Sequence, residues 1–185
     1  KVYASVKPTE RYVVKPTDFH ALTPKLAVKV GDKVKAGTAL FFDKYNDKIN
    51  FCSPVSGEVT AIVRGAKRKI LEVVLKADFE IAYDAFTTDT ADSLSREQII
   101  ERMLKAGVWP FIRQKPYDTI ANPIDMPKAI FISAFNTAPL TIDNDFALYG
   151  MDELFQKGLD YIVKLTSGKT HLNIDGTTNP SKVFT

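Results

Sequence analysis

Hydrophobic and polar positions alternate over short distances in the first 80 residues of the chain. Valine, leucine, isoleucine and phenylalanine recur in short runs, and glycine, proline and charged residues interrupt these runs. This pattern is typical of the short strands of a small β-barrel. The apolar positions are Val2, Val6, Val13, Val28, Val30, Val34, Leu40, Phe42, Val55, Val59, Ile62, Ile70, Val73 and Leu75. A hairpin tip is predicted at residues 64–69.

Glycine marks the corners of this predicted barrel. Two segments with a similar pattern, residues 30–41 and 53–62, place Gly31, Gly37 and Gly57 between β-branched residues. Only glycine adopts a positive φ at little cost, so we expect short strands to reverse at these positions. The spacing resembles the hammerhead of biotinyl/lipoyl-type domains. Such a domain either carries a cofactor on a hairpin lysine or has a structural role in a larger assembly.

The next part of the chain predicts a connector and then a helix. Residues 78–94 are polar and rich in Asp and Thr, as in a linker. Ser95 and Gln98 form a capping box, which starts a helix that Gly107 ends. Its apolar face is formed by Ile99, Ile100, Met103 and Leu104. Residues 108–127 contain four prolines and are predicted to form a loop.

The last third of the chain predicts a strand, a helix and a strand. Residues 128–135 form a continuous apolar run, which favours a strand buried on both faces of a parallel sheet. A helix over 152–165, ended by Gly168, precedes a strand over 170–174. This order predicts a right-handed βαβ crossover. Because two strands rarely form a stable sheet, we expect the chain to be the N-terminal fragment of a longer protein.

Composition and charge exclude several classes of protein. The net charge of +3 is too small to indicate nucleic-acid binding, and no apolar run approaches the roughly 18 residues of a membrane span. His20, His171 and Cys52 do not form a recognisable metal site, so we predict no metal. The sequence contains no dinucleotide-binding glycine motif, no P-loop and no nucleophile elbow. We therefore predict no catalytic residue in this chain.

Several short motifs, taken in order, resemble one known family over nearly the whole chain. They are Arg64–Arg68, Leu94–Gln98, Ala106–Trp109, Arg113–Tyr117, Ala129–Leu140, Gly158–Leu159 and Leu165–Lys169. This ordered set resembles the A subunit of the bacterial Na⁺-translocating NADH:quinone oxidoreductase. The resemblance implies a peripheral protein at the cytoplasmic face of the bacterial inner membrane. Its partners would be the other members of a complex of six subunits that passes electrons from NADH to quinone and exports sodium, with no nucleic acid involved.

The resemblance also implies a fold of mixed α+β or α/β class. Residues 1–80 would form the biotinyl/lipoyl-like barrel-sandwich domain, and residues 81–185 a truncated Rossmann-like α/β domain. That fold resembles the NADH-binding subunit of respiratory complex I and the C subunit of the Rnf complex. Those relatives carry a glycine-rich loop for flavin phosphate, whereas residues 107–113 here have one glycine and two bulky aromatics. Close approach of the backbone to a phosphate is hindered, so we expect neither FMN nor NADH to bind.

Quinone, either ubiquinone or menaquinone, is the ligand that the resemblance implies. A quinone ring needs flat apolar walls and one or two hydrogen-bond donors. Trp109, Phe111 and Arg113 offer one such set, unless the aromatics pack between domains. A second set, Asn136, Thr137 and Pro139, follows the predicted buried strand, where open α/β sheets bind ligands. The alternative for this second set is a structural turn.

Two groups of basic residues suggest other roles. Arg64, Lys67, Arg68 and Lys69 form a basic hairpin tip that could dock onto an anionic lipid surface or a partner protein of the complex, or could be an ordinary charged turn. Lys44 and Lys48 lie where a carrier domain bears its modified lysine. The alternative functions are therefore a hammerhead carrier or docking scaffold without quinone binding, and a flavoprotein subunit of the Rnf or complex I type.

Overall fold

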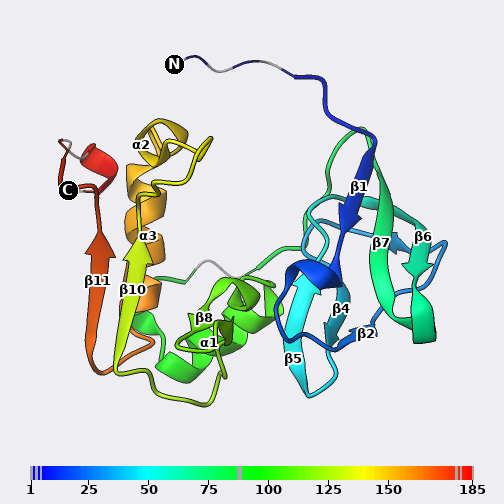
Figure 1. The fold of residues 1–185 in the computed structure, drawn as a ribbon, viewed down its shortest axis with the longest axis horizontal. Helices are drawn as coiled ribbons and strands as arrows, with labels where there is room; N and C mark the ends of the chain where they lie inside the picture. The colour runs from blue at the N-terminus through cyan, green and yellow to red at the C-terminus, as the bar shows by residue number, and fades with distance from the viewer. Residues whose placement is uncertain are drawn as a thin grey trace. The chain divides into compact units, whose positions relative to one another are not determined.

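The computed structural model describes residues 2, 4, 6–86, 89–177, 179 and 181–184. The chain divides into two compact units, which we describe separately (Figure 1). The first, called the barrel unit, comprises Ala4–Thr87 and Ile100–Pro123. The second, called the α/β unit, comprises Lys1–Tyr3, Thr88–Ile99 and Ile124–Thr185. The predicted division into residues 1–80 and 81–185 stays a prediction.

Two antiparallel sheets form the barrel within this unit, as the alternating pattern predicts. One sheet has the order β1-β7-β6-β3 and the other has the order β2-β4-β5. Both sheets contribute fully buried side chains to the core, including Leu40, Phe41, Val59, Val73 and Leu75. The strands are β1 (Arg11–Val14), β2 (Pro24–Leu26), β3 (Lys33–Val34), β4 (Ala39–Asp43), β5 (Asn46–Cys52), β6 (Gly57–Arg64) and β7 (Ile70–Ala77). Short 3₁₀ turns are η1 (Pro16–Asp18) and η2 (Ala66–Arg68).

The three predicted corner glycines all have positive φ. The values are 92° at Gly31, 101° at Gly37 and 154° at Gly57. At Gly57 a Cβ atom would also lie only 2.0 Å from the carbonyl oxygen of Lys76 on the neighbouring strand. Only glycine therefore allows β6 to begin so close to β7.

The polar segment after the barrel is held more firmly than its composition predicts. The backbone N–H of Ala36 donates to the carbonyl of Ala82 (2.9 Å), and the N–H of Asp84 donates to the carbonyl of Ala36 (2.8 Å). The Thr38 hydroxyl donates to the Asp84 carboxylate at 2.8 Å, and the buried Ser56 hydroxyl accepts from the N–H of Ala82 at 2.9 Å. Part of the expected linker is thus a strap on the barrel.

The C-terminal end of helix α1 (Arg96–Lys105) belongs to the barrel unit. Gly107 follows the helix with φ +71°, as expected for a residue just beyond a helix end. A Cβ atom there would lie 2.6 Å from Sγ of Cys52 on β5. The region after Gly107, predicted to be a loop, contains η4 (Trp109–Phe111) and a two-stranded hairpin, β8 (Arg113–Gln114) with β9 (Thr119–Ile120). Contacts between η4 and β5, which local sequence cannot reveal, bring this region onto the barrel unit.

The α/β unit contains the predicted strand–helix–strand order. Its elements are η3 (Ala91–Ser93), β10 (Ala129–Ser133), α2 (Asn144–Ala147), α3 (Asp152–Val163), β11 (Lys169–Asn173) and η5 (Lys182–Phe184). β10 and β11 pair in parallel, from Ala129 opposite Lys169 to Ser133 opposite Asn173. The capping box also forms, since Ser95 and Gln98 each accept a backbone N–H from the other.

The expectation that residues 128–135 are buried on both faces is wrong. Ile130 and Ile132 are half-buried, but Phe131 is 68% exposed and stacks on the His171 ring, with centroids 4.8 Å apart. In the described part of the chain, α3 packs against β11 and only two strands form this sheet, so one face lacks a cover.

No helix among the described residues is both long and apolar enough to cross a membrane.

The close packing of Gly107 on Cys52 gives a prediction for stability. We expect Gly107→Ala to destabilise the barrel unit by about 2–4 kcal/mol, because about 1 kcal/mol of left-handed strain adds to about 1–3 kcal/mol of overpacking. Gly31→Ala is the matched control, since Gly31 has a positive φ but open space around it. It should cost only about 1 kcal/mol. Urea unfolding followed by the fluorescence of Trp109, the only tryptophan, measures both variants; equal losses would contradict the packing argument.

Candidate functional site

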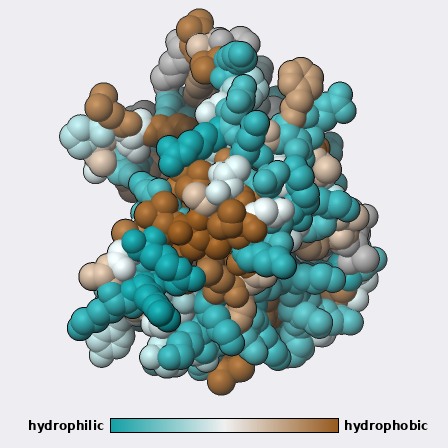
Figure 2. Space-filling model, turned by 90° about the vertical axis from the view of Figure 1, so that its right-hand side faces the viewer, coloured by the Kyte–Doolittle hydropathy of each residue, from teal (hydrophilic) through white to brown (hydrophobic). Residues whose placement is uncertain are grey.

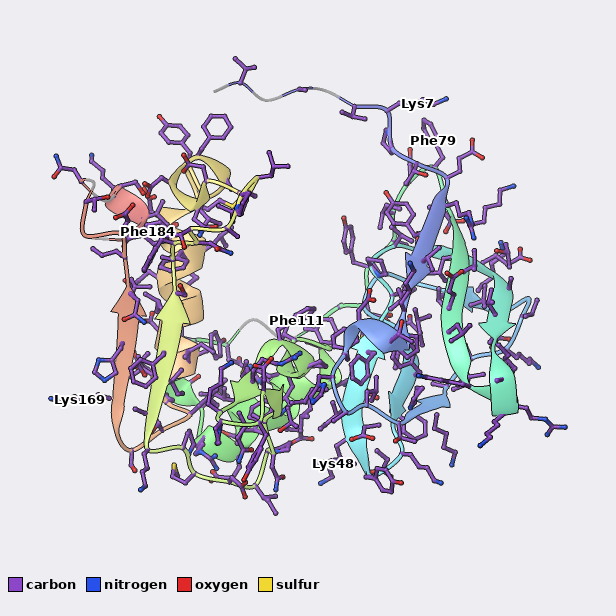
Figure 3. All side chains as sticks on the ribbon, viewed as in Figure 1. Lys7, Lys48, Phe79, Phe111, Lys169 and Phe184 are labelled. Carbon is purple, nitrogen blue, oxygen red and sulfur yellow. The ribbon has the colours of Figure 1, made fainter. Side chains whose placement is uncertain are left out.

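A cavity lies at the carboxyl ends of the two parallel strands of the α/β unit. Both β10 and β11 end at the same edge because they are parallel, and open α/β sheets bind ligands at such edges. The cavity has a volume of about 390 Å³. Its apolar walls are Phe135, Ile142, Ile174 and Phe184. Phe184 is labelled in Figure 3, beside the ends of these strands.

Hydrogen bonds hold the loops that form the cavity. Asn136 Oδ1 accepts from the N–H of Ala138 at 2.9 Å, and Asn144 Nδ2 donates to the carbonyl of Ala134 at 2.8 Å. Asp143 caps α2 by accepting from the N–H of Phe146 at 3.1 Å. The cavity wall is therefore built by bonds from side chains to the backbone in and around α2.

The polar part of the cavity is acidic. Asp143, Asp145 and Asp175 all line it. Hydrogen bonds from the hydroxyl and the backbone N–H of Thr177 hold the pKa of Asp175 below its usual range, so this carboxylate is ionised at neutral pH. Carboxylates repel phosphate groups, whereas an uncharged ring is not repelled. The lining therefore suits a neutral, partly apolar ligand better than a nucleotide.

Only one residue of the second predicted set lines this cavity. Asn136 lines it, with its Oδ1 already accepting a backbone bond, whereas Thr137 and Pro139 are exposed and lie outside the lining. Sequence reasoning missed the apolar walls. Phe135 was within the predicted strand and Ile174 at the end of the next one, so the strand-end rule could have identified both. Phe184 lies far along the chain and gives no local signal.

The first predicted set lies in the barrel unit. Trp109 is buried and its indole N–H donates to the carbonyl of Ala121 at 2.7 Å. The Arg113 guanidinium contacts Asp118, with Nη2 3.3 Å from a carboxylate oxygen. Phe111 is 72% exposed, and its ring meets the Phe19 ring edge-on at a centroid distance of 6.1 Å. The Trp109 indole N–H and the Arg113 guanidinium thus already have partners within the chain. The assignment of this set to quinone binding stays a prediction.

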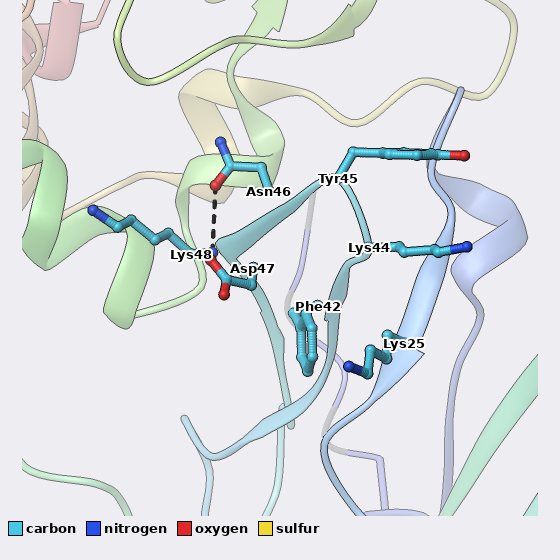
Figure 4. Close-up of a pocket in the computed structure, with 7 residues that line it drawn as sticks. All are labelled: Lys25, Phe42, Lys44, Tyr45, Asn46, Asp47 and Lys48. Carbon is cyan, nitrogen blue, oxygen red and sulfur yellow. Dashed lines mark hydrogen bonds between the residues drawn. The ribbon is translucent and has the colours of Figure 1, made fainter.

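The hairpin between β4 and β5 presents the possible carrier lysine (Figure 4). Asp43 pairs with Asn46, so Lys44 and Tyr45 form the two-residue turn. The Nζ of Lys44 lies 5.9 Å from the centroid of the Tyr45 ring, whereas Lys48 projects from the other side of the hairpin in Figure 4. The surrounding hollow has a volume of about 620 Å³ and is open.

No group of three or more His, Cys, Asp or Glu side chains suited to a metal occurs among the residues that the structure describes. Burial, and next the charge of Asp84, raises the pKa of the Cys52 thiol to about 11. The thiol is therefore protonated at neutral pH, and only the thiolate is a good nucleophile or metal ligand.

Comparison with known proteins defines the class first. A family model described as the NqrA N-terminal barrel-sandwich hybrid domain matches residues 1–78, and a model of the NqrA second alpha/beta domain matches residues 94–183. The chain therefore combines a barrel-sandwich hybrid with an α/β domain, which confirms the predicted fold class. It belongs to the NqrA family.

Curated relatives agree with this assignment. The chain is 37% identical over 150 residues to the A subunit of the Na(+)-translocating NADH-quinone reductase of Pseudomonas aeruginosa strain UCBPP-PA14, covering 80% of this chain and 34% of the relative. The corresponding proteins of Yersinia pseudotuberculosis serotype O:1b and Photorhabdus laumondii are 36% and 35% identical, over 84% and 89% of this chain and 35% and 38% of their own lengths. The chain thus spans about a third of the length of these relatives. The resemblance drawn from the sequence motifs is confirmed.

Proposed function

We propose that this chain acts as part of the A subunit of a Na⁺-translocating NADH:quinone reductase and that its α/β unit receives the quinone ring. The relatives carry the name of that enzyme complex, and this supports the assignment of the chain to it. In this proposal the chain is a peripheral component at the cytoplasmic face of the bacterial inner membrane. Its partners are the other members of the complex of six subunits.

The cavity at the carboxyl ends of β10 and β11 is the observation that carries the quinone proposal. Its volume of about 390 Å³ lies in the range of small-molecule sites, which is about 300–1,000 Å³. Phe135 and Phe184 offer aromatic surface for a flat ring, and Ile142 and Ile174 offer aliphatic surface. A neutral quinone avoids the repulsion that the aspartates of the lining would exert on a phosphate.

Asn136 is the proposed donor to the quinone. Because its Oδ1 accepts the N–H of Ala138, the amide orientation is fixed and the Nδ2 group is left to donate. A quinone carbonyl is an acceptor and takes such a bond without a change of charge. The chain binds and orients the ring in this account, and the electrons come from other parts of the complex.

The variant Asn136→Ala tests the proposal in the assembled complex. We expect the apparent KM for quinone to rise about 2- to 10-fold, which corresponds to the loss of one neutral hydrogen bond of about 0.5–1.5 kcal/mol. Thr137→Ala is the matched control, since Thr137 is the next residue and lies outside the cavity lining. Steady-state kinetics with a short-chain quinone measures both variants. An unchanged KM in Asn136→Ala, or an equal rise in both, would contradict the site.

The carrier function is a second candidate, favoured by the position of Lys44 in the tight turn of the β4–β5 hairpin. The two functions predict different masses. A carrier isolated from a host that lipoylates and biotinylates its proteins would gain the mass of one acyl group on Lys44, whereas the proposed quinone function requires no modification. We expect the intact mass to equal that of the unmodified chain; a modified Lys44 would favour the carrier.

The absence of bound FMN and NADH stays a prediction, which titration with each compound tests.

A further inference from the structure

The tip of the β6–β7 hairpin is a firmly closed turn. We call residues 64–69 the basic tip. The N–H of Gly65 donates to the carbonyl of Lys69 at 2.8 Å, and the N–H of Lys69 donates to the carbonyl of Ala66 at 3.2 Å. A guanidinium nitrogen of Arg64 donates to the carbonyl of Arg68 at 3.1 Å. These three bonds fix the path of the backbone between two long paired strands.

Two of the basic residues hold a backbone conformation that is unusual for their type. Lys67 has φ +53° and Arg68 has φ +61°, both in the left-handed region. Glycine or asparagine would adopt this region at lower cost. Strained residues of this kind cluster at active sites, ligand-binding segments and switch regions. Lys67 and Arg68 thus stand where glycine or asparagine would give the same turn with less strain.

All four cations of the basic tip are exposed. None of Arg64, Lys67, Arg68 and Lys69 takes part in an ion pair within the part of the chain that the structure describes. The tip contains no acidic residue. Its positive charge is therefore available to an anionic partner.

The chemistry of the tip fits a lipid surface better than a protein. Protein interfaces are enriched in aromatic residues and arginine and depleted of lysine, whereas the tip has two lysines beside its two arginines and no aromatic side chain. Next to the tip, Val63 is 39% exposed and Leu71 is half-buried. Figure 2 shows a patch of hydrophobic side chains on one face of the molecule, surrounded by hydrophilic ones. Clustered cations beside aliphatic side chains are typical of segments that contact anionic bilayers.

We propose that the basic tip is an electrostatic docking point for the head groups of anionic phospholipids. Arg64, Lys67, Arg68 and Lys69 neutralise lipid phosphates, and the fixed turn holds the four charges within one short segment. Each lysine or arginine near such a surface adds its own contribution to the binding free energy, and salt weakens each contribution by screening the charges. This docking does not depend on the proposed quinone site.

The test measures co-sedimentation of the 185-residue chain with vesicles of phosphatidylcholine, with and without phosphatidylglycerol. The variant Lys67→Asn/Arg68→Asn removes two charges, and asparagine tolerates the left-handed backbone, so the turn is kept. Lys44→Gln/Lys48→Gln removes the same charge from the β4–β5 hairpin and is the matched control. Thermal unfolding of each variant checks that the fold is retained.

We expect binding only to vesicles that contain phosphatidylglycerol, with a loss of about tenfold or more in the asparagine variant and less than about threefold in the control. High salt should abolish binding. The proposal is overturned by absent binding to anionic vesicles, by equal losses in the two variants, or by an asparagine variant that binds like wild type. Absent vesicle binding, combined with loss of complex assembly in the asparagine variant, would instead identify an acidic protein surface as the partner.

Discussion

The parallel pairing of β10 and β11 depends on close contact between the two turns that precede these strands. Because the strands are parallel, their carboxyl ends leave the sheet at the same edge. Gly168 precedes β11, and a Cβ atom there would lie only 1.8 Å from the carbonyl oxygen of Lys128, just before β10. The Thr166 hydroxyl donates to the carbonyl of Pro127 at 2.6 Å and accepts the N–H of Gly168 at 2.9 Å. These contacts bring the two strands into register, and the cavity at their far ends follows from that register.

The two units of the chain serve different proposed roles. The α/β unit offers a cavity with aromatic and aliphatic walls and one oriented amide, which suits binding of a ring. The barrel unit has two exposed hairpins with basic side chains, one of which borders an open hollow. In the two proposals, the barrel unit docks the chain and the α/β unit binds the quinone ring.

Local signals predicted a large part of the fold. The corner glycines, the capping box of Ser95 and Gln98 and the β6–β7 hairpin tip depend on neighbouring residues, so the sequence alone identified them. The strap at residues 80–86 and the packing of η4 depend on distant partners such as Ser56 and β5. The apolar run at β10 predicted burial on both faces, but burial depends on which elements cover the sheet and not on the strand alone.

The candidate site was predictable only in part for the same reason. Asn136 was found because strand ends bind ligands, whereas Phe184 reaches the cavity through tertiary packing, with its ring edge-on to the Phe155 ring at 5.2 Å. The sequence suggested Trp109 as a binding surface because it cannot show that the carbonyl of Ala121 takes the indole N–H.

Photoaffinity labelling with an azido-quinone, followed by mass mapping of the labelled peptides, tests the central claim most directly. A short-chain quinone serves as competitor, and the label that it displaces marks the site. The account predicts displaceable label on the residues that line the cavity, which are 134–136, 141–145, 174, 175 and 184. Displaceable label confined to residues 107–123 of the barrel unit, or an absence of displaceable label in the chain within the assembled complex, would contradict it.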